Sequence, residues 1–234
     1  MTPIVLIPGL ACTAELFAAQ IPALWRHGPV TFASTMEGET IADMAAAILR
    51  DAPPRFALGG LSMGGYIALE IMRQAPERVM KLALLDTSAR PDTPEQSAQR
   101  RALITRAQAG ELEPVLRQIA PNLLHPDHRA DQRLIEAQVR MGLAVGADGF
   151  ARQQTAIIGR ADSRPHLGAI RIPTLVLVGD KDALTPPDRS EEMSAAIPDA
   201  RLVIVPECGH ASTLEQPEAV NVALVEWLSL RPSS

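Results

Sequence analysis

Short continuous runs of Val, Leu and Ile recur along this chain, and longer stretches with helical periodicity separate them. Such runs are typical of strands that are buried on both faces, as in parallel sheets covered by helices. Strands that alternate with helices and are joined by right-handed crossovers form a doubly wound sheet. The sequence therefore predicts an α/β fold with a mostly parallel sheet of about six strands, expected at residues 3–7, 30–33, 55–58, 81–86, 173–179 and 201–206.

The alternation stops in the middle of the chain. Residues 91–166 contain no convincing strand pattern, and the helical stretches that we expect there are 96–109, 112–120 and 130–143. This segment holds ten arginines and nine acidic residues, a near balance that we interpret as a solvated surface. The sequence thus predicts an α/β core, residues 1–90 and 167–234, with a helical cap inserted at 91–166.

Composition excludes several classes of partner. The formal net charge of −5 over 234 residues gives no basic surface for nucleic acid or an anionic membrane. Cys12 and Cys208 are too few for a disulfide framework and lack metal-ligand spacing, so we expect no metal and no cofactor. The apolar N-terminal run is too short to span a bilayer, and no basic residue precedes it, so we expect a cytoplasmic protein.

One serine is surrounded by glycines in the segment LGGLSMGGY, residues 58–66. Residues 60–64 read G-x-S-x-G, between a predicted strand and a predicted helix, which is the context of a nucleophile elbow. In that turn the residues two before and two after the serine must be small, and Gly60 and Gly64 meet this demand. The alternative interpretation is a glycine-rich turn in which Ser62 only caps the following helix.

A serine hydroxyl is a weak nucleophile until a base takes its proton. Such a base is a histidine oriented by a carboxylate, in the chain order Ser, acid, His. Asp180 and Asp182 both follow the strand expected at 173–179, and His210 follows the strand expected at 201–206. Because ligands bind beyond the carboxyl ends of parallel strands, these loops are predicted to meet Ser62 in one crevice.

With these residues in place, the chain resembles the α/β-hydrolase family over nearly its whole length outside the cap. The matching segments are IPGL (7–10), GGLSMGG (59–65), QAPERVMKLALLDT (74–87), PTLVLVGDKDALTPP (173–187) and PECGHASTLEQPE (206–218). The resemblance implies the α/β-hydrolase fold with a minimal, six-stranded sheet, since the family's usual two N-terminal strands are missing. Most members carry His-Gly where this chain has Pro8-Gly9.

The resemblance also assigns roles to residues. It implies Ser62 as nucleophile, Asp182 as the acid, by the pattern G-x-x-D counted from Gly179, and His210 as base. It further implies that the backbone N–H groups of Leu10 and Met63 form an oxyanion hole.

The function that we predict is hydrolysis of small carboxylic esters through an acyl-enzyme, on a pocket that we expect to be apolar around Ala11, Leu184 and Ala211. The alternatives are a methyl esterase that acts on a substrate linked to an acidic carrier protein, an enol-lactonase and a carbon–carbon bond hydrolase. A non-enzymatic alternative is a binding or receptor protein that keeps the fold. An Asp nucleophile, as in epoxide hydrolases and dehalogenases, is disfavoured because the position holds Ser62. The oligomeric state is not predicted.

Overall fold

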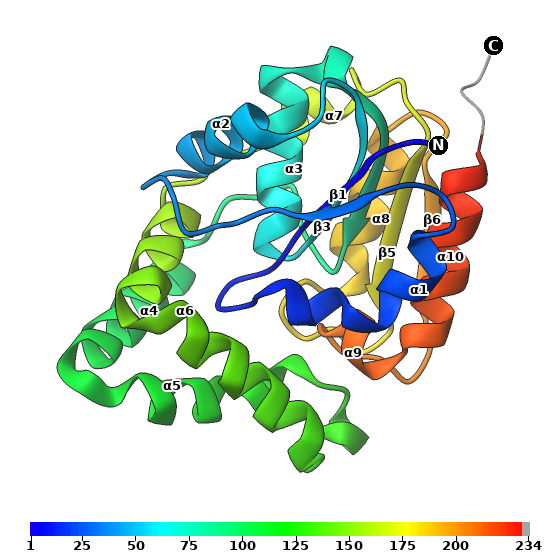
Figure 1. Ribbon diagram of the computed structural model, residues 1–234. Coiled ribbons are helices and arrows are strands. Elements are labelled where there is room, and N and C mark those ends of the chain that lie inside the picture. Colours follow the sequence, from blue (N-terminus) through cyan, green and yellow to red (C-terminus); the bar gives the residue numbers. More distant parts are fainter. Residues whose placement is uncertain (231–234) are drawn as a thin grey trace.

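Parallel strands form a sheet in the order β2-β1-β3-β4-β5-β6 in the computed structural model, which describes residues 1–230 (Figure 1). The chain order reverses at β1, so the sheet is doubly wound, as predicted. Its strands are β1 (Ile4–Ile7), β2 (Val30–Phe32), β3 (Phe56–Leu61), β4 (Val79–Leu85), β5 (Thr174–Gly179) and β6 (Arg201–Val205).

Helices connect the strands. Thr40 begins α2 with a capping box, because its hydroxyl accepts from the Asp43 N–H and the Asp43 carboxylate accepts from the Thr40 N–H. The α-helices are α1 (Ile21–Leu24), α2 (Ile41–Asp51), α3 (Met63–Gln74), α4 (Pro94–Arg106), α5 (Leu112–Ile119), α6 (Gln132–Ile158), α7 (Arg164–Leu167), α8 (Pro187–Ala196), α9 (Ser212–Glu215) and α10 (Pro217–Ser229). A 3₁₀ segment, Ala14–Gln20, precedes α1.

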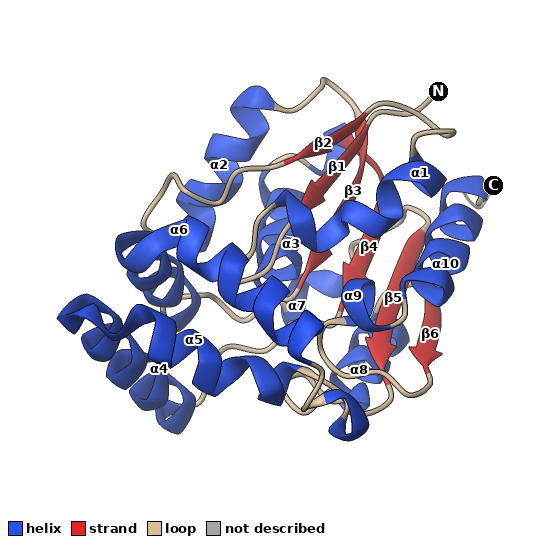
Figure 2. Cartoon of the chain, turned by 60° about the horizontal axis from the view of Figure 1, so that its bottom comes forward, coloured by secondary structure: helices blue, strands red, loops and turns tan. Residues whose placement is uncertain are grey.

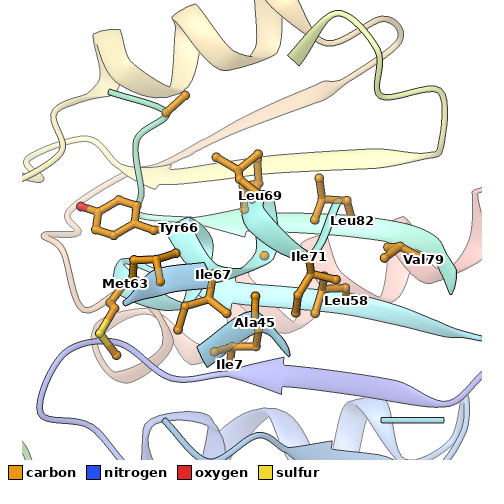
Figure 3. Close-up of a cluster of buried hydrophobic side chains, with 14 of the residues drawn as sticks. Ile7, Ala45, Leu58, Met63, Tyr66, Ile67, Leu69, Ile71, Val79 and Leu82 are labelled. Carbon is orange, nitrogen blue, oxygen red and sulfur yellow. The ribbon is translucent and has the colours of Figure 1, made fainter. Parts of the chain in front are cut away.

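Both faces of the sheet are covered, which explains why the strands read as continuous apolar runs. Alternate strand residues enter two separate cores. One core includes side chains from α2, α3 and α8, and part of it is drawn in Figure 3. The other includes side chains from α1 and α10, which lie together on the opposite face (Figure 2).

Several elements differ from the sequence-based expectation, and three of the differences are large. Strand β3 continues beyond residue 58 to Leu61, because the added glycines fit a crowded sheet interior where a Gly59 side chain would lie 2.8 Å from Leu6. Helix α6 runs past residue 143 to Ile158 and is kinked where Gly146 adopts φ 76°. Helix α8 was not predicted, because its sequence is mostly polar and it begins at the second of two consecutive prolines.

Between β4 and β5 the regular elements are helical, and α4, α5 and α6 group to one side of the sheet (Figure 1). We call residues 94–158 the cap helices. Their own apolar cluster, with Val115, Leu116 and Phe150, also contains Ala11 and Ala211 from loops of the sheet. The cap helices therefore pack directly on the loops that carry the predicted site. Within residues 1–230, no helix has the length and apolar character needed to cross a membrane.

Candidate active site

Ser62 occupies the sharp turn between β3 and α3, in a strained backbone conformation with φ 56° and ψ −115°. A side chain at Gly60 would lie 2.2 Å from the carbonyl oxygen of Gly64, and one at Gly64 would lie 2.0 Å from that of Ile7. Both positions therefore exclude any residue larger than glycine. Among the described residues 1–230, the Ser62 side chain makes no capping hydrogen bond, so the local geometry is that of an elbow and not of a helix cap.

His210 faces this serine from the loop after β6. Its Nε2 lies 2.8 Å from the Ser62 Oγ, and its ring is buried. The loop is fixed from the cap side, since the His210 N–H donates to the carbonyl oxygen of Leu123 at 2.8 Å. The buried Glu215 carboxylate adds to this, because it accepts from the N–H groups of Gly209 and His125. The imidazole is thus held by both the sheet and the cap helices.

Asp182 completes a hydrogen-bonded chain. Its Oδ2 lies 2.8 Å from the His210 Nδ1. The carboxylate also accepts from the N–H groups of Leu184 and Thr185 and from the Thr185 hydroxyl, at 2.7–2.9 Å. Asp180, the other acid that the sequence left open, instead accepts from the Cys208 N–H at 3.1 Å. The geometry therefore selects Asp182 as the partner of His210.

The negative charge of Asp182 and the positive charge of a protonated His210 stabilise each other. Burial raises the pKa of the Asp182 carboxyl, but the His210 charge and the hydrogen bonds outweigh burial and hold that pKa below its usual value. Burial lowers the pKa of His210, but the Asp182 carboxylate outweighs it, so that the pKa of His210 is raised above 6.5. The arrangement can therefore take a proton from Ser62 and stabilise the resulting imidazolium.

The two backbone N–H groups expected in an oxyanion hole belong to Leu10, which lines the cavity together with Ser62, and to Met63, which directly follows Ser62 in the chain. As far as residues 1–230 are concerned, neither N–H donates a hydrogen bond to the protein. The Leu10 loop is held by the buried Gln153 of α6, whose Oε1 accepts from the N–H of Ala11 at 2.9 Å. Ala11 has φ 55°, a conformation that disfavours residues with a side chain, so this hydrogen bond stabilises an uncommon loop geometry.

A cavity of about 500 Å³ opens beside Ser62 and His210. Of the predicted pocket residues, Leu184 and Ala211 line it, whereas Ala11 does not, because its side chain is buried against the cap helices. The pocket was expected to be apolar, but only part of the cavity wall is apolar. The lining also includes the polar and charged residues Tyr66, Arg90, Asp92, Gln96, Gln99, Arg100, Gln138, Gln154, Arg160 and Arg189.

Several residues of the site were not predicted from the sequence. Asp86 and Glu215 lie inside segments that carry the family resemblance, yet only their burial and hydrogen bonds reveal a role. Thr185 lies in the loop after β5, three residues beyond Asp182, and its hydroxyl donates to the Asp182 carboxylate. This donor could have been predicted from its position in the sequence. Gln153, Arg100 and Arg160 come from the cap segment, whose helical pattern does not reveal which side chains point inward, whereas the cavity residues Arg90 and Arg189 lie outside that segment.

Two further histidines and both cysteines have structural positions. His128 Nδ1 lies 2.8 Å from the Glu215 carboxylate, and His125 Nδ1 accepts from the N–H of Asp127. Cys12 and Cys208 are free. Burial raises the pKa of the Cys12 thiol to about 12, so this cavity residue is no competing thiolate nucleophile near neutral pH.

Comparison with known proteins gives the class. Residues 4–223 match the model of the Alpha/beta hydrolase family, so the chain belongs to that family and is an enzyme. It is 30% identical over 220 residues to a pimeloyl-[acyl-carrier protein] methyl ester esterase of Neisseria meningitidis, covering 92% of this chain and 83% of the relative.

Solved structures agree in fold. An esterase from Thermogutta terrifontis superposes with a TM-score of 0.87 at 32% identity, covering 97% of this chain and 89% of that chain. The enol-lactonase from Burkholderia xenovorans LB400 superposes with a TM-score of 0.88 at 25% identity, covering 98% of this chain and 92% of that chain.

Proposed function

We propose that the protein is a serine hydrolase that cleaves small carboxylic esters through an acyl-enzyme on Ser62. The observation that carries this proposal is the hydrogen-bonded chain from Ser62 Oγ to His210 Nε2 and from His210 Nδ1 to Asp182, with 2.8 Å at both contacts, at the wall of a cavity. The relative named a methyl ester esterase and the structural neighbour named an esterase support the same reaction class.

In the proposed reaction, Ser62 Oγ attacks the ester carbonyl carbon while His210 Nε2 takes the hydroxyl proton. The carbonyl oxygen becomes an oxyanion that accepts from the Leu10 and Met63 N–H groups, each worth on the order of 3 kcal/mol of barrier in such sites. The intermediate then expels the alkoxide, which takes the proton from His210 and leaves as the alcohol. A water, deprotonated by His210, attacks the acyl-Ser62 carbonyl, releasing the acid and restoring the serine.

We further propose that residues 91–166 act as the cap of this site. Leu103, Ile119 and Leu123 from this segment line the cavity together with Ser62 and His210. A lining shared in this way limits the size of the substrate and excludes bulk water from the acyl-enzyme. Short to medium acyl chains are therefore the substrates that fit.

Covalent labelling tests the nucleophile. A fluorophosphonate is expected to add once to the wild-type protein at Ser62, and Ser62→Ala should lose both the label and ester hydrolysis. Ser88→Ala is a matched control, because Ser88 lines the same cavity but has no histidine partner, and it should still be labelled at Ser62. Labelling at another residue, or hydrolysis by Ser62→Ala at the wild-type rate, would refute the proposal.

A second candidate follows from the relative in Neisseria, a methyl esterase of a carrier-linked substrate. Capture of an acidic carrier would need free cationic groups on the cap, and several arginines there already have partners. Arg106 pairs with Glu111, Arg117 pairs with Glu113 and Glu136, and Arg100 lines the cavity. A carrier-linked methyl ester that is cleaved much faster than the free ester, with the advantage lost at high salt, would favour this candidate.

A further inference from the structure

The wall of the cavity carries an excess of positive charge. Four arginines line the cavity, and Asp92 is the single carboxylate among its lining residues within the described chain. Arg90 pairs with Glu192, and Arg189 pairs with Asp188. Neither of these two carboxylates lines the cavity. Arg100 and Arg160 share Asp92 instead, so we define the charged cluster as Asp92, Arg100 and Arg160.

The charged cluster is internally hydrogen-bonded, and its Asp92 and Arg160 side chains are buried, whereas the Arg100 side chain is 22% exposed. Asp92 Oδ2 accepts from Arg100 Nε and Asp92 Oδ1 accepts from Arg160 Nη1, both at 2.6 Å. The Asp92 side chain is 1% exposed and that of Arg160 is 7% exposed. Arg100 also donates to Gln154 at 2.7 Å, and Arg160 donates to the carbonyl oxygen of Arg90. Two guanidinium groups around one carboxylate leave a net charge of +1 in a largely buried wall.

Donor groups remain unused in the charged cluster. Within residues 1–230, neither the Nη2 of Arg100 nor the Nη2 of Arg160 donates a hydrogen bond to the protein. An uncompensated buried charge is costly, whereas an anion that receives these N–H groups would remove the cost. Planar guanidinium groups suit a carboxylate, since they donate paired hydrogen bonds to its two oxygens. The net charge of +1 matches a monoanion.

The charged cluster and Ser62 line the same cavity, and Tyr66 contacts both of them. Tyr66 lies one turn, about 5.4 Å, along α3 from Ser62, and its N–H donates to the Ser62 carbonyl oxygen. The guanidinium carbon of Arg160 lies 4.2 Å from the centre of the Tyr66 ring. Figure 3 shows the Tyr66 ring at the edge of the aliphatic cluster, with its hydroxyl directed away from it. Apolar lining from Leu61, Leu103 and Ile157 leaves room for a methylene chain.

From this arrangement, and on the basis of the proposed function, we propose that the charged cluster binds a second, free carboxylate of the substrate. The substrate class is then a half-ester of an aliphatic dicarboxylic acid. Its ester carbonyl lies at Ser62, its methylenes contact the apolar lining, and its carboxylate receives the N–H groups of Arg100 and Arg160.

Matched substrates test this proposal. Monomethyl glutarate, adipate and pimelate are compared in a pH-stat assay with methyl pentanoate, hexanoate and heptanoate, which have equal acyl lengths and no charge. The expected kcat/KM of the fitting half-ester exceeds that of its neutral partner by about tenfold to hundredfold, as for hydrogen bonds to a charged group. Hydrolysis of the neutral esters without this preference would refute the carboxylate subsite and leave the proposed function standing.

Variants identify the group that carries the preference. We define the preference as the kcat/KM of the half-ester divided by that of the neutral ester of equal acyl length. Arg160→Gln should reduce this ratio to within about threefold of unity while hydrolysis of methyl hexanoate persists. Arg101→Gln, one residue from Arg100 but exposed and outside the cavity, should keep the full preference. Asp92→Asn removes the competing carboxylate and should increase the preference, which keeps the test valid if Arg160→Gln fails to fold. Equal preferences in all four proteins would overturn the proposal.

Binding without catalysis separates the subsite from the reaction. Titration calorimetry of Ser62→Ala with adipate should give binding that Arg160→Gln in the same background weakens by about tenfold or more. Inorganic phosphate should bind more weakly than adipate. Stronger binding of phosphate would refute the carboxylate and assign the charged cluster to a phosphate group. No esterase activity together with intact adipate binding would refute the proposed function while supporting the subsite.

Discussion

Asp86 directly follows β4, and Asp182 follows β5, the neighbouring strand, by three residues. Both carboxyl groups are buried, and both are close enough to His210 to change its pKa. The Asp182 carboxylate contacts the His210 Nδ1 and accepts from the N–H groups of Leu184 and Thr185 and from the Thr185 hydroxyl. The Asp86 carboxyl contacts only the Gly179 N–H and the Ser212 hydroxyl among residues 1–230. The two carboxyl groups are thus similarly buried, but Asp182 has four hydrogen-bond partners and Asp86 has two.

The difference appears in the charge of the two groups. Burial, followed by the charge of Asp182, raises the pKa of Asp86 to about 8, although His210 and the two hydrogen bonds oppose this. The pKa of Asp182 is lowered despite its burial, because the His210 charge and the donors outweigh desolvation. Two buried aspartates on adjacent strands therefore carry different charges at neutral pH. The donors around each carboxyl, and not burial alone, decide which one can stabilise an imidazolium.

The largest expected effect comes from removing the charge of Asp182. Asp182→Asn keeps the size of the side chain but removes the charge that stabilises the His210 imidazolium, and it presents an N–H or an uncharged oxygen to Nδ1. A loss of about four orders of magnitude in kcat is expected for a triad acid, measured with an activated ester. Asp180→Asn is the matched control, because Asp180 contacts the Cys208 N–H and not His210. A larger loss in Asp180→Asn than in Asp182→Asn would show that the wrong acid is assigned.

The pH dependence of kcat/KM reports the charge of His210 in the free enzyme. Only the neutral imidazole accepts the Ser62 proton, so activity should rise with pH. Because the Asp182 carboxylate raises the pKa of His210 above 6.5, the midpoint of this rise should lie above 6.5. In Asp182→Asn the residual activity should have a lower midpoint, since burial then acts with less opposition. An unchanged midpoint in that variant would contradict the coupling of the two groups.

Two hydroxyl deletions compare the donors of the two carboxyl groups. Thr185→Val removes the hydroxyl that donates to Asp182 Oδ2 at 2.7 Å, and a hydrogen bond to a charged group is worth about 1.5–3 kcal/mol. Its kcat should fall by about tenfold or more. Ser212→Ala removes the hydroxyl beside Asp86 and should change kcat by less than about threefold, because a mostly neutral carboxyl needs this donor less. Equal losses in the two variants would contradict the difference in charge.

The comparison also shows what a sequence can predict. The six-stranded sheet, the elbow at Ser62 and the loop positions of Asp182 and His210 follow from strand order and glycine spacing, which are local or topological signals. The cavity wall formed by the cap could not be predicted in this way. Whether Arg160 contacts Asp92 or solvent depends on how α6 is rotated and where Gly146 kinks it. Likewise, the charge of Asp86 depends on donors that lie 93 and 126 residues away in the chain.

Replacement of Asp86 is expected to have the smallest effect on activity. An Asn in this position is nearly isosteric with a protonated Asp: its Oδ1 can accept from the Gly179 N–H, and its Nδ2 can donate to the Ser212 hydroxyl. Since the raised pKa of Asp86 keeps most of this carboxyl protonated at neutral pH, Asp86→Asn should keep kcat within about threefold of the wild type. A loss of tenfold or more near pH 7 would mean that an ionised Asp86 assists His210.

The same variant has a distinct signature in stability. The folded wild type retains a proton on Asp86 up to about pH 8, whereas the unfolded chain releases it near the ordinary value of 3.8. Between these values the folded state binds more protons, so Asp86 makes the protein less stable as pH rises, by at most about 1.4 kcal/mol per pH unit. Asn does not titrate, so the free energy of unfolding of Asp86→Asn, measured by urea denaturation, should increase relative to the wild type from about pH 5 to about pH 8. A constant difference over this range would show that Asp86 is ionised in the folded protein, and the contrast with Asp182 would then disappear.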